Sequence, residues 1–286
     1  MTAAALALTA AVLMHVAWNL LARAGHPDTR FLWWALVGYL VVLGPWSLYA
    51  LISQAHWSLD LAGLLVISAL ANALYFLVLG AAYRHAPVAL VYPIARSSPL
   101  LIALWSSQLF GEMMAASGWL GILITVAGLL LLAISARHGD TRRAVLWAVI
   151  AAFATSVYSL SNKFAVASLP TYGSQLGLVS VDLTVSFIAL SLEQRVRLGR
   201  WRPPAMPPIV RWIPAGLFIG NAYGLVIFAM QYLSAAYAVA FTNAGIVIAG
   251  LLSIFVFGER ERWSTRLAAM VIITFGLAVL AISARR

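Results

Sequence analysis

The sequence contains no cysteine and very little charge. Of its 286 residues, 9% are charged and 63% are hydrophobic. The lack of cysteine excludes disulfide bonds, a thiolate nucleophile and metal sites built on cysteine ligands. Soluble globular domains have about 25% charged residues, so the shortage of charge excludes that class of protein.

Recognisable catalytic motifs are also missing. The chain has no Walker A sequence, no H-E-x-x-H motif and no G-x-S-x-G motif. We therefore expect no direct use of ATP, no metal and no other cofactor. An intramembrane lipid-modifying enzyme would need a nucleophile beside a base, or a metal triad. The sequence shows neither, so we expect that the protein is not an enzyme and keep this class as an alternative.

Acidic residues are scarcer than basic ones. The chain has 8 Asp and Glu against 18 Lys and Arg, which gives a net charge of +10. Such a balance can indicate a nucleic-acid partner. Here the basic residues lie in short connections between apolar runs, where they fit the orientation of membrane helices better. We expect a lipid bilayer as the surrounding medium and no nucleic-acid partner.

Long apolar runs recur along the whole chain. Each is long enough to cross a hydrocarbon core about 30 Å thick as a helix. The sequence therefore predicts an all-α integral membrane protein with ten transmembrane helices. The predicted spans cover residues 3–22, 31–53, 61–83, 87–110, 117–136, 144–166, 174–192, 211–232, 235–257 and 264–284.

The two halves of the chain resemble each other. Three short motifs recur at offsets of 147 to 149 residues: "FGE" at 110–112 and 257–259, "LAISAR" at 132–137 and 280–285, and "NALY" at 72–75 against "NAY" at 221–223. A repeat of five spans enters the membrane upside down in its second copy, because five is an odd number of crossings. We expect two inverted five-helix repeats, 1–138 and 139–286. The glycine of each "FGE" predicts a tight helix end.

These features resemble the EamA-type drug/metabolite transporter superfamily. The resemblance rests on the ten spans, the five-plus-five repeat, "GE" after spans 4 and 9, and "HVAWN" at His15 to Asn19. It implies a carrier of small metabolites such as amino acids, sugars or phosphorylated compounds, located in the bacterial inner membrane. It also implies a small-molecule substrate as partner. A fused repeat can close its own pathway, so we expect a monomer or a loose dimer.

The charge distribution predicts an unusual orientation. The connections after the odd-numbered spans hold 14 Lys and Arg, whereas the other side holds Lys163, Arg285 and Arg286. The positive-inside rule then places both termini outside the cytoplasm. Carriers of the family that this chain resembles usually have both termini inside.

The segment "VYPIARSSP", Val91 to Pro99, places a full charge inside span 4. A charge at such a depth costs about 2.5–3.5 kcal/mol on insertion scales and typically marks a substrate path or an ion pair. Tyr92 shares a helix face with Arg96, and the two prolines free backbone carbonyls in the middle of the span. We predict that Arg96 binds an anionic group of the substrate. An ion pair with Asp182 is the alternative. The residue 149 positions later is Gly245, so the charge is not shared by both copies.

Asp182 is the only acidic residue well inside a span. A carboxyl group at that depth can carry a proton for coupled transport, or it can balance Arg96. Both interpretations remain open. His15 is a second candidate for proton coupling.

Further polar side chains recur on several spans. For each of them, hydrogen bonding between helices and contact with a ligand are both open. Together they suggest a polar central pathway. The candidates are Asn19, Asn72, Tyr75, Tyr158, Asn162, Asn221 and Asn243. We predict a secondary-active carrier of a small polar, anionic or zwitterionic metabolite that works by alternating access. A passive channel is a further alternative.

Overall fold

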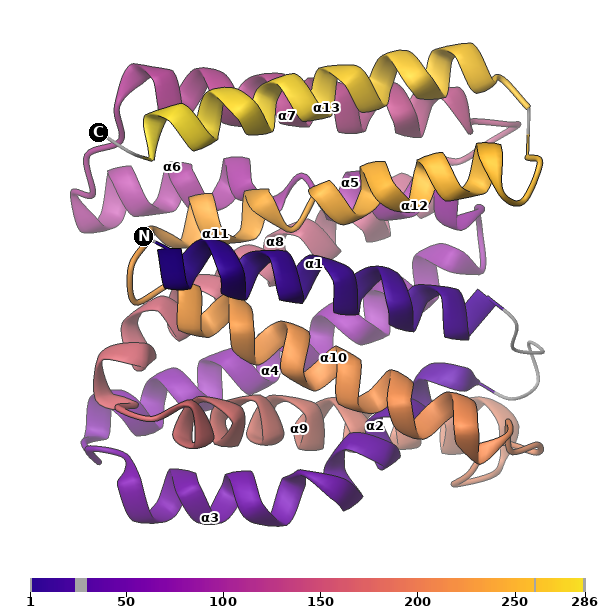
Figure 1. Ribbon diagram of the computed structural model, residues 1–286. Coiled ribbons are helices and arrows are strands. Elements are labelled where there is room, and N and C mark those ends of the chain that lie inside the picture. The colour runs from indigo at the N-terminus through magenta and orange to yellow at the C-terminus, as the bar shows by residue number, and fades with distance from the viewer. Residues whose placement is uncertain (1, 24–29, 260, 285–286) are drawn as a thin grey trace. The chain divides into compact units, whose positions relative to one another are not determined.

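The structure is a computed structural model that describes residues 2–23, 30–259 and 261–284 (Figure 1). Within those residues it is helical, without strands. The helices are α1 (Thr2–Arg23), α2 (Phe31–Val42), α3 (Gly44–Gln54), α4 (Leu59–Tyr83), α5 (Val88–Ala95), α6 (Ser98–Phe110), α7 (Ala116–Ser135), α8 (Arg142–Ala165), the short η2 (Val166–Ser168), α9 (Tyr172–Leu198), α10 (Ile209–Ala229), α11 (Ala235–Phe241), α12 (Ala244–Phe255) and α13 (Trp263–Ser283).

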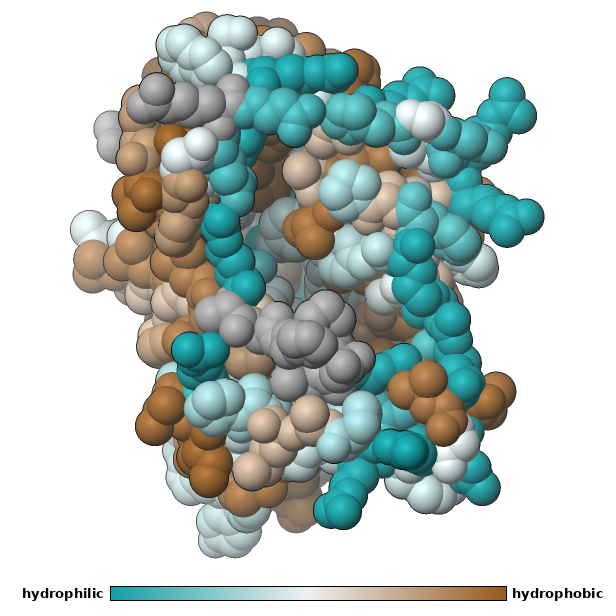
Figure 2. All heavy atoms as spheres, turned by 90° about the vertical axis from the view of Figure 1, so that its right-hand side faces the viewer, coloured by the Kyte–Doolittle hydropathy of each residue, from teal (hydrophilic) through white to brown (hydrophobic). Residues whose placement is uncertain are grey.

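The predicted spans agree with these helices. Nine helical stretches of the described chain are long and apolar enough to cross a membrane, and α2 with α3 form a tenth candidate that is bent by 56°. The protein is therefore an all-α, multi-pass membrane protein. Most boundaries lie within a few residues of the predicted ones. Figure 2 shows one end of the helices, where hydrophilic side chains gather beside hydrophobic flanks.

The end of α9 is the largest difference from the predicted boundaries. The apolar run suggested an end at residue 192, whereas the helix continues to Leu198. Arg195 and Arg197 occupy the last turn, where cations favour the negative end of the helix dipole, and Gly199 ends the helix with a φ of 69°. The helix therefore extends six residues beyond the apolar run.

Three spans are broken near their middle. Span 2 breaks at Leu43, directly before Gly44 and Pro45, and span 4 breaks at Arg96 and Ser97, before Pro99. A proline near a helix start lacks the N–H that would continue the preceding helix. The prediction that span 4 is loosened at its middle is confirmed. Span 9 breaks at Thr242 and Asn243, between α11 and α12. The breaks in spans 2 and 9 were not predicted.

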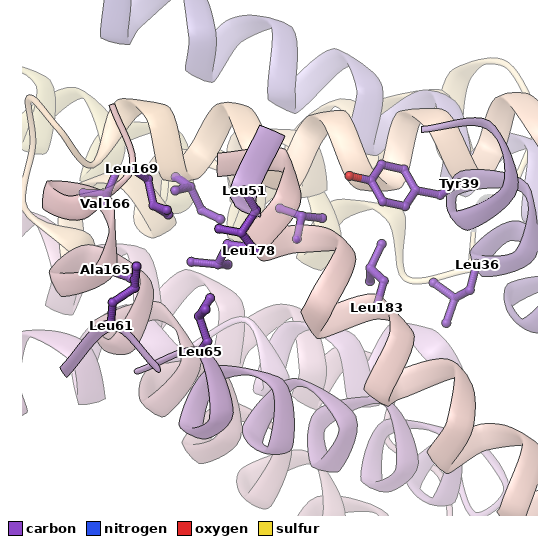
Figure 3. Close-up of a cluster of buried hydrophobic side chains, with 12 residues drawn as sticks. Leu36, Tyr39, Leu51, Leu61, Leu65, Ala165, Val166, Leu169, Leu178 and Leu183 are labelled. Carbon is purple, nitrogen blue, oxygen red and sulfur yellow. The ribbon is translucent and has the colours of Figure 1, made fainter. Parts of the chain in front are cut away.

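The first compact unit, here unit 1, comprises the described residues of Met1–Leu77 and Ser161–Tyr232. In it α1 and α2 pack on α10, and α3 packs on α9. Figure 3 shows its core, which includes Tyr39 and several leucines. The side chain of Tyr39 is fully buried, and its hydroxyl donates a hydrogen bond to the Leu176 carbonyl over 3.1 Å. The buried hydroxyl is therefore satisfied.

The second compact unit, here unit 2, comprises the described residues of Val78–Leu160 and Leu233–Arg286. Its most extensive helix packing is between α7 and α13, which run side by side (Figure 1). A Cβ atom on Gly121 would lie 3.0 Å from the Gly276 carbonyl oxygen, and one on Gly128 would lie 3.0 Å from the Ala269 carbonyl oxygen. The small residues let the two backbones approach closely.

The two "FGE" motifs have the same local structure. Gly111 and Gly258 have φ angles of 64° and 71°. The following backbone N–H groups, of Glu112 and Glu259, each donate over 3.0 Å to the serine carbonyl six residues earlier. The predicted tight helix ends are confirmed.

An offset of 147 residues relates these helix ends, and it also relates Pro87 to Ser234, the residues that precede α5 and α11. With this offset the counterpart of Arg96 is Asn243, which stands at the break of span 9. The pairing of Arg96 with Gly245 was therefore wrong. Each compact unit contains parts of both sequence halves, and the repeat boundary at residue 138 stays a prediction.

Candidate functional site

A closed group of four polar side chains surrounds Asp182 inside unit 1, and we call it the Asp182 ring. It joins Ser68 of α4, Asn162 of α8, Asp182 of α9 and Tyr223 of α10. Asp182, Asn162 and Ser68 are fully buried. Four helices therefore contribute one polar group each to a single point within the membrane-spanning part of the unit.

The ring is continuous. The Ser68 hydroxyl lies 2.7 Å from Asn162 Oδ1 and 2.8 Å from Asp182 Oδ2. The Tyr223 hydroxyl donates to the same Asp182 Oδ2 over 2.8 Å, and Asn162 Nδ2 donates to the Tyr223 hydroxyl oxygen. Every member therefore contacts two others.

Counting hydrogens shows what the Asp182 ring can do. The Ser68 hydroxyl has one hydrogen but faces two acceptors, Asn162 Oδ1 and Asp182 Oδ2. If Asp182 is ionised, Ser68 can serve only one of them. If Asp182 carries a proton and donates it to Ser68, then Ser68 donates to Asn162, Asn162 to Tyr223 and Tyr223 back to Asp182. The ring can therefore take up one proton and satisfy all four contacts.

A second hydrogen-bonded group adjoins the Asp182 ring. The Ser186 hydroxyl, one turn after Asp182 on α9, lies 2.8 Å from Asn72 Oδ1 and 2.8 Å from the Asp182 carbonyl oxygen. Asn72 is itself one turn after Ser68 on α4. The other carboxylate oxygen, Asp182 Oδ1, is buried without a hydrogen-bond partner in the described part of the chain. Such an atom is costly to leave unsatisfied, so it marks the side of the carboxyl group where a further donor would bind.

The remaining candidates in unit 1 make contacts outside the Asp182 ring. Asn19 Nδ2 donates to the His15 carbonyl oxygen over 2.6 Å, and His15 Nδ1 accepts a hydrogen bond from Trp18 over 3.2 Å. Asn221 Nδ2 donates to the carbonyl of Leu217, one turn earlier, over 2.9 Å, and Asn221 Oδ1 accepts a hydrogen bond from the Tyr172 hydroxyl of α9 over 3.2 Å. Tyr75 packs its ring edge against Phe76. None of these contacts joins the Asp182 ring.

Arg96 lies at the broken helix of unit 2. It ends α5, and its guanidinium carbon stands 5.3 Å from the centre of the Tyr92 ring, a cation–π distance. Asn243, at the break of span 9, donates from Nδ2 to the Arg96 carbonyl oxygen over 3.3 Å. The two breaks therefore meet, and the fully buried Asn243 retains an Oδ1 atom without a hydrogen-bond partner among the described residues.

The predicted residues thus form two groups. Asp182, Asn162 and Asn72 come together in unit 1, and Arg96, Tyr92 and Asn243 come together in unit 2. Tyr158 belongs to unit 2 although Asn162, on the same helix, belongs to unit 1. An ion pair between Arg96 and Asp182 would join the two units and stays a prediction.

Three members of these groups were not among the predicted site residues: Ser68, Ser186 and Tyr223. Ser68 and Ser186 each lie one turn from a predicted residue, Asn72 and Asp182, on the same helix face. That spacing is the signal that could have found them. Tyr223 is two residues from Asn221, so spacing on its helix does not connect it to the predicted set.

Comparisons with known proteins agree with this fold. The sequence model of the EamA-like transporter family matches residues 1–134 and again residues 142–282. A solved crystal structure, described only as that of a protein, is 22% identical with a TM-score of 0.73, and the match covers 100% of this chain and 99% of that one. It is one of 27 matching chains of solved structures. No curated protein matches the chain. The structural likeness shows the fold.

Proposed function

The chain belongs to the EamA-like transporter family, and from this premise we propose that it is a secondary-active carrier of a small anionic or zwitterionic metabolite. The family and the apolar helices make it a membrane transporter of small molecules. Alternating access, the anionic substrate, proton coupling and a place in the bacterial inner membrane are the proposed refinements.

Arg96 supports the choice of an anionic substrate. It carries a full charge inside a predicted span, at a break where the regular backbone hydrogen bonding of the helix is interrupted. Broken helices in transporters typically present backbone and side-chain groups to a substrate near the membrane midplane. The planar guanidinium offers paired donors that match a carboxylate or a phosphate.

The Asp182 ring supports the proposal that transport is coupled to protons. It is the one place in the described residues where a fully buried carboxyl group meets hydroxyl and amide groups from three other helices. A proton can enter this ring without breaking a contact, so loading and unloading it would bias the packing of α4, α8, α9 and α10. In a carrier, such a bias links proton movement to the exchange between inward-open and outward-open forms.

Counterflow in proteoliposomes tests the carrier function. Purified protein is reconstituted in vesicles loaded with unlabelled amino acids, organic acids or sugar phosphates, and entry of the labelled compound is followed. A carrier gives saturable, transient accumulation of at least one compound. Unsaturable flux in every case would indicate a pore, and chemical conversion of the compound would indicate an enzyme. Either result would overturn the proposal.

A further inference from the structure

An apolar groove lies on unit 2 between α5, α7 and α8. Its volume is about 530 Å³, within the range of about 300–1,000 Å³ that is usual for small-molecule sites. Its walls include Leu90 and Ile94 of α5, Leu130 and Ile134 of α7, and Val149 of α8. All of its lining residues belong to unit 2, so the groove is complete within that unit.

One side of the groove is exposed. Leu130, Ile134 and Val149 are 43%, 63% and 49% exposed, whereas Leu90 is 2% exposed and forms the floor. In a protein whose helices cross a membrane, exposed apolar side chains at this depth face hydrocarbon. We therefore expect this side of the groove to face the bilayer, where an acyl chain would enter it.

One end of the groove is basic and polar. Arg137 follows α7, Arg142 begins α8, and Thr141 lies between them. No ion pair or side-chain hydrogen bond occupies the guanidinium groups of Arg137 and Arg142 among the described residues. The nearest carboxylate in sequence, Asp140, accepts instead from the Arg142 backbone N–H over 3.1 Å.

Thr141 supplies an independent observation. Its side chain is 3% exposed, and its hydroxyl is buried without a hydrogen-bond partner in the described part of the chain. A buried hydroxyl that is not paired is costly, so it marks a position where a ligand acceptor would bind. It lies in the lining of the groove, beside Arg137 and Arg142.

We propose that this groove binds one anionic phospholipid of the adjacent leaflet. The phosphate contacts Arg137 and Arg142 and accepts a hydrogen bond from Thr141, and an acyl chain lies along Leu130, Ile134 and Val149. Val149 is seven residues after Arg142 on α8, so the apolar wall reaches about 10 Å from the basic end, well into a leaflet about 15 Å deep. Basic pockets between transmembrane helices bind anionic headgroups in this manner.

The apolar wall distinguishes a lipid from a free anion. A soluble phosphate would use the basic end alone and leave the rest of the groove empty. The transported metabolite is a different ligand, because nearly all of this lining is hydrocarbon and Arg96 does not belong to it. The lipid site is independent of the proposed carrier function, since it requires only that the helices cross a membrane.

Native mass spectrometry of the full chain, released from detergent micelles, tests the site. The probes are phosphatidylglycerol and phosphatidylcholine with equal acyl chains. Wild type retains one phosphatidylglycerol in preference to phosphatidylcholine. The double variant Arg137→Gln/Arg142→Gln weakens that binding by about tenfold or more, because each surface arginine contributes about 1 kcal/mol toward an anionic lipid. The matched control is Arg200→Gln/Arg202→Gln, two exposed arginines outside the groove, which leaves the binding unchanged.

A second variant tests the apolar wall. Val149→Trp fills the exposed side of the groove and reduces phosphatidylglycerol binding with no change in charge, so it keeps the test valid if the arginine variant fails to fold. Glycerol phosphate at the same concentration does not compete in wild type. Equal retention of both lipids, equal loss in the control variant, or competition by glycerol phosphate would each overturn the proposal.

Discussion

At the scale of single residues, the Asp182 ring makes every member depend on two neighbours. Removing the Tyr223 hydroxyl takes one donor from Asp182 Oδ2 and the acceptor from Asn162 Nδ2. Leaving buried polar groups unsatisfied costs about 1–3 kcal/mol each. We therefore expect Tyr223→Phe to lower the free energy of unfolding by about that amount, measured as a lower midpoint of thermal unfolding in detergent.

Tyr232→Phe is the matched control for this loss. Tyr232 is 50% exposed, and its ring packs on Phe228, while its hydroxyl makes no hydrogen bond within the described part of the chain. Its unfolding midpoint should equal that of wild type. If Tyr223→Phe is equally neutral, the Asp182 ring does not stabilise unit 1.

Arg96 gives a second test at this scale. A charge-assisted hydrogen bond is worth about 1.5–3 kcal/mol, so Arg96→Ala should weaken binding of the best anionic ligand by about 10- to 100-fold. Arg96→Lys keeps the charge but not the paired donors, and it should lie between wild type and Arg96→Ala. Ligand-induced thermal stabilisation over a metabolite panel measures this. Unchanged stabilisation in Arg96→Ala would remove Arg96 from the site.

Sequence reasoning found charged groups in the membrane more readily than their partners. Asp182 and Arg96 were evident because a charge inside an apolar run is rare and costly. Ser68 was not evident, because the hydroxyl of a serine in a helix can donate to a backbone carbonyl of the same helix. Only tertiary packing decides whether it does so or bonds to another helix. The counterpart of Arg96 was misplaced by two residues, because the offset of 149 that holds for "NALY" and "NAY" was applied to a span whose helix starts repeat at 147.

At the scale of helices, close backbone contact makes particular glycines indispensable. A Cβ atom on Gly216 of α10 would lie 2.1 Å from the Ala35 carbonyl oxygen and 2.8 Å from the Tyr39 amide nitrogen, both in α2. These backbone atoms can move only if the helices separate. Gly216→Ala should therefore overpack this contact and lower the free energy of unfolding of unit 1 by about 1–3 kcal/mol. Thermal unfolding measures it.

Gly63 of α4 is the opposite case. No atom lies within 4 Å of a Cβ added there. Because alanine favours a helix over glycine by about 1 kcal/mol, Gly63→Ala should be neutral or stabilising. The same loss of stability in both variants would contradict the close approach of α10 to α2.

Prolines stand beside some helix breaks and not beside others. Pro99 stands next to the break in span 4, and Pro45 next to that in span 2. Pro93 and Pro214, however, lie inside α5 and α10 without ending them. The break at Thr242 and Asn243 has no proline. There the Thr242 hydroxyl donates to the Val239 carbonyl over 2.6 Å, a competition with backbone bonding that sequence alone does not reveal.

At the scale of the whole molecule, hydropathy located the spans well because each is a strong, local signal. The two compact units were not foreseen, since they combine segments from both halves of the chain and depend on which helices pack together. Of the charges on the sparsely basic side, Lys163 donates to the Met230 carbonyl over 2.6 Å, and Arg285 and Arg286 lie outside the described residues.

Orientation is the prediction that belongs to this scale. The excess of arginine in the connections after odd-numbered spans predicts that those connections lie in the cytoplasm and that both termini lie outside. An alkaline phosphatase fused to the C-terminus should be active, and one inserted near Met206, between α9 and α10, should be inactive. The reverse pattern would show that the family's usual orientation holds despite the charges.

Transport driven by a pH gradient tests the central claim most directly. In proteoliposomes, an inward proton gradient should accelerate uptake of the compound that gives counterflow. Asp182→Asn should lose this acceleration and keep counterflow, because exchange needs the substrate site but not a proton on Asp182. Asp60→Asn, an exposed acid at the start of α4, should behave as wild type. Gradient-driven uptake that persists unchanged in Asp182→Asn would contradict the account.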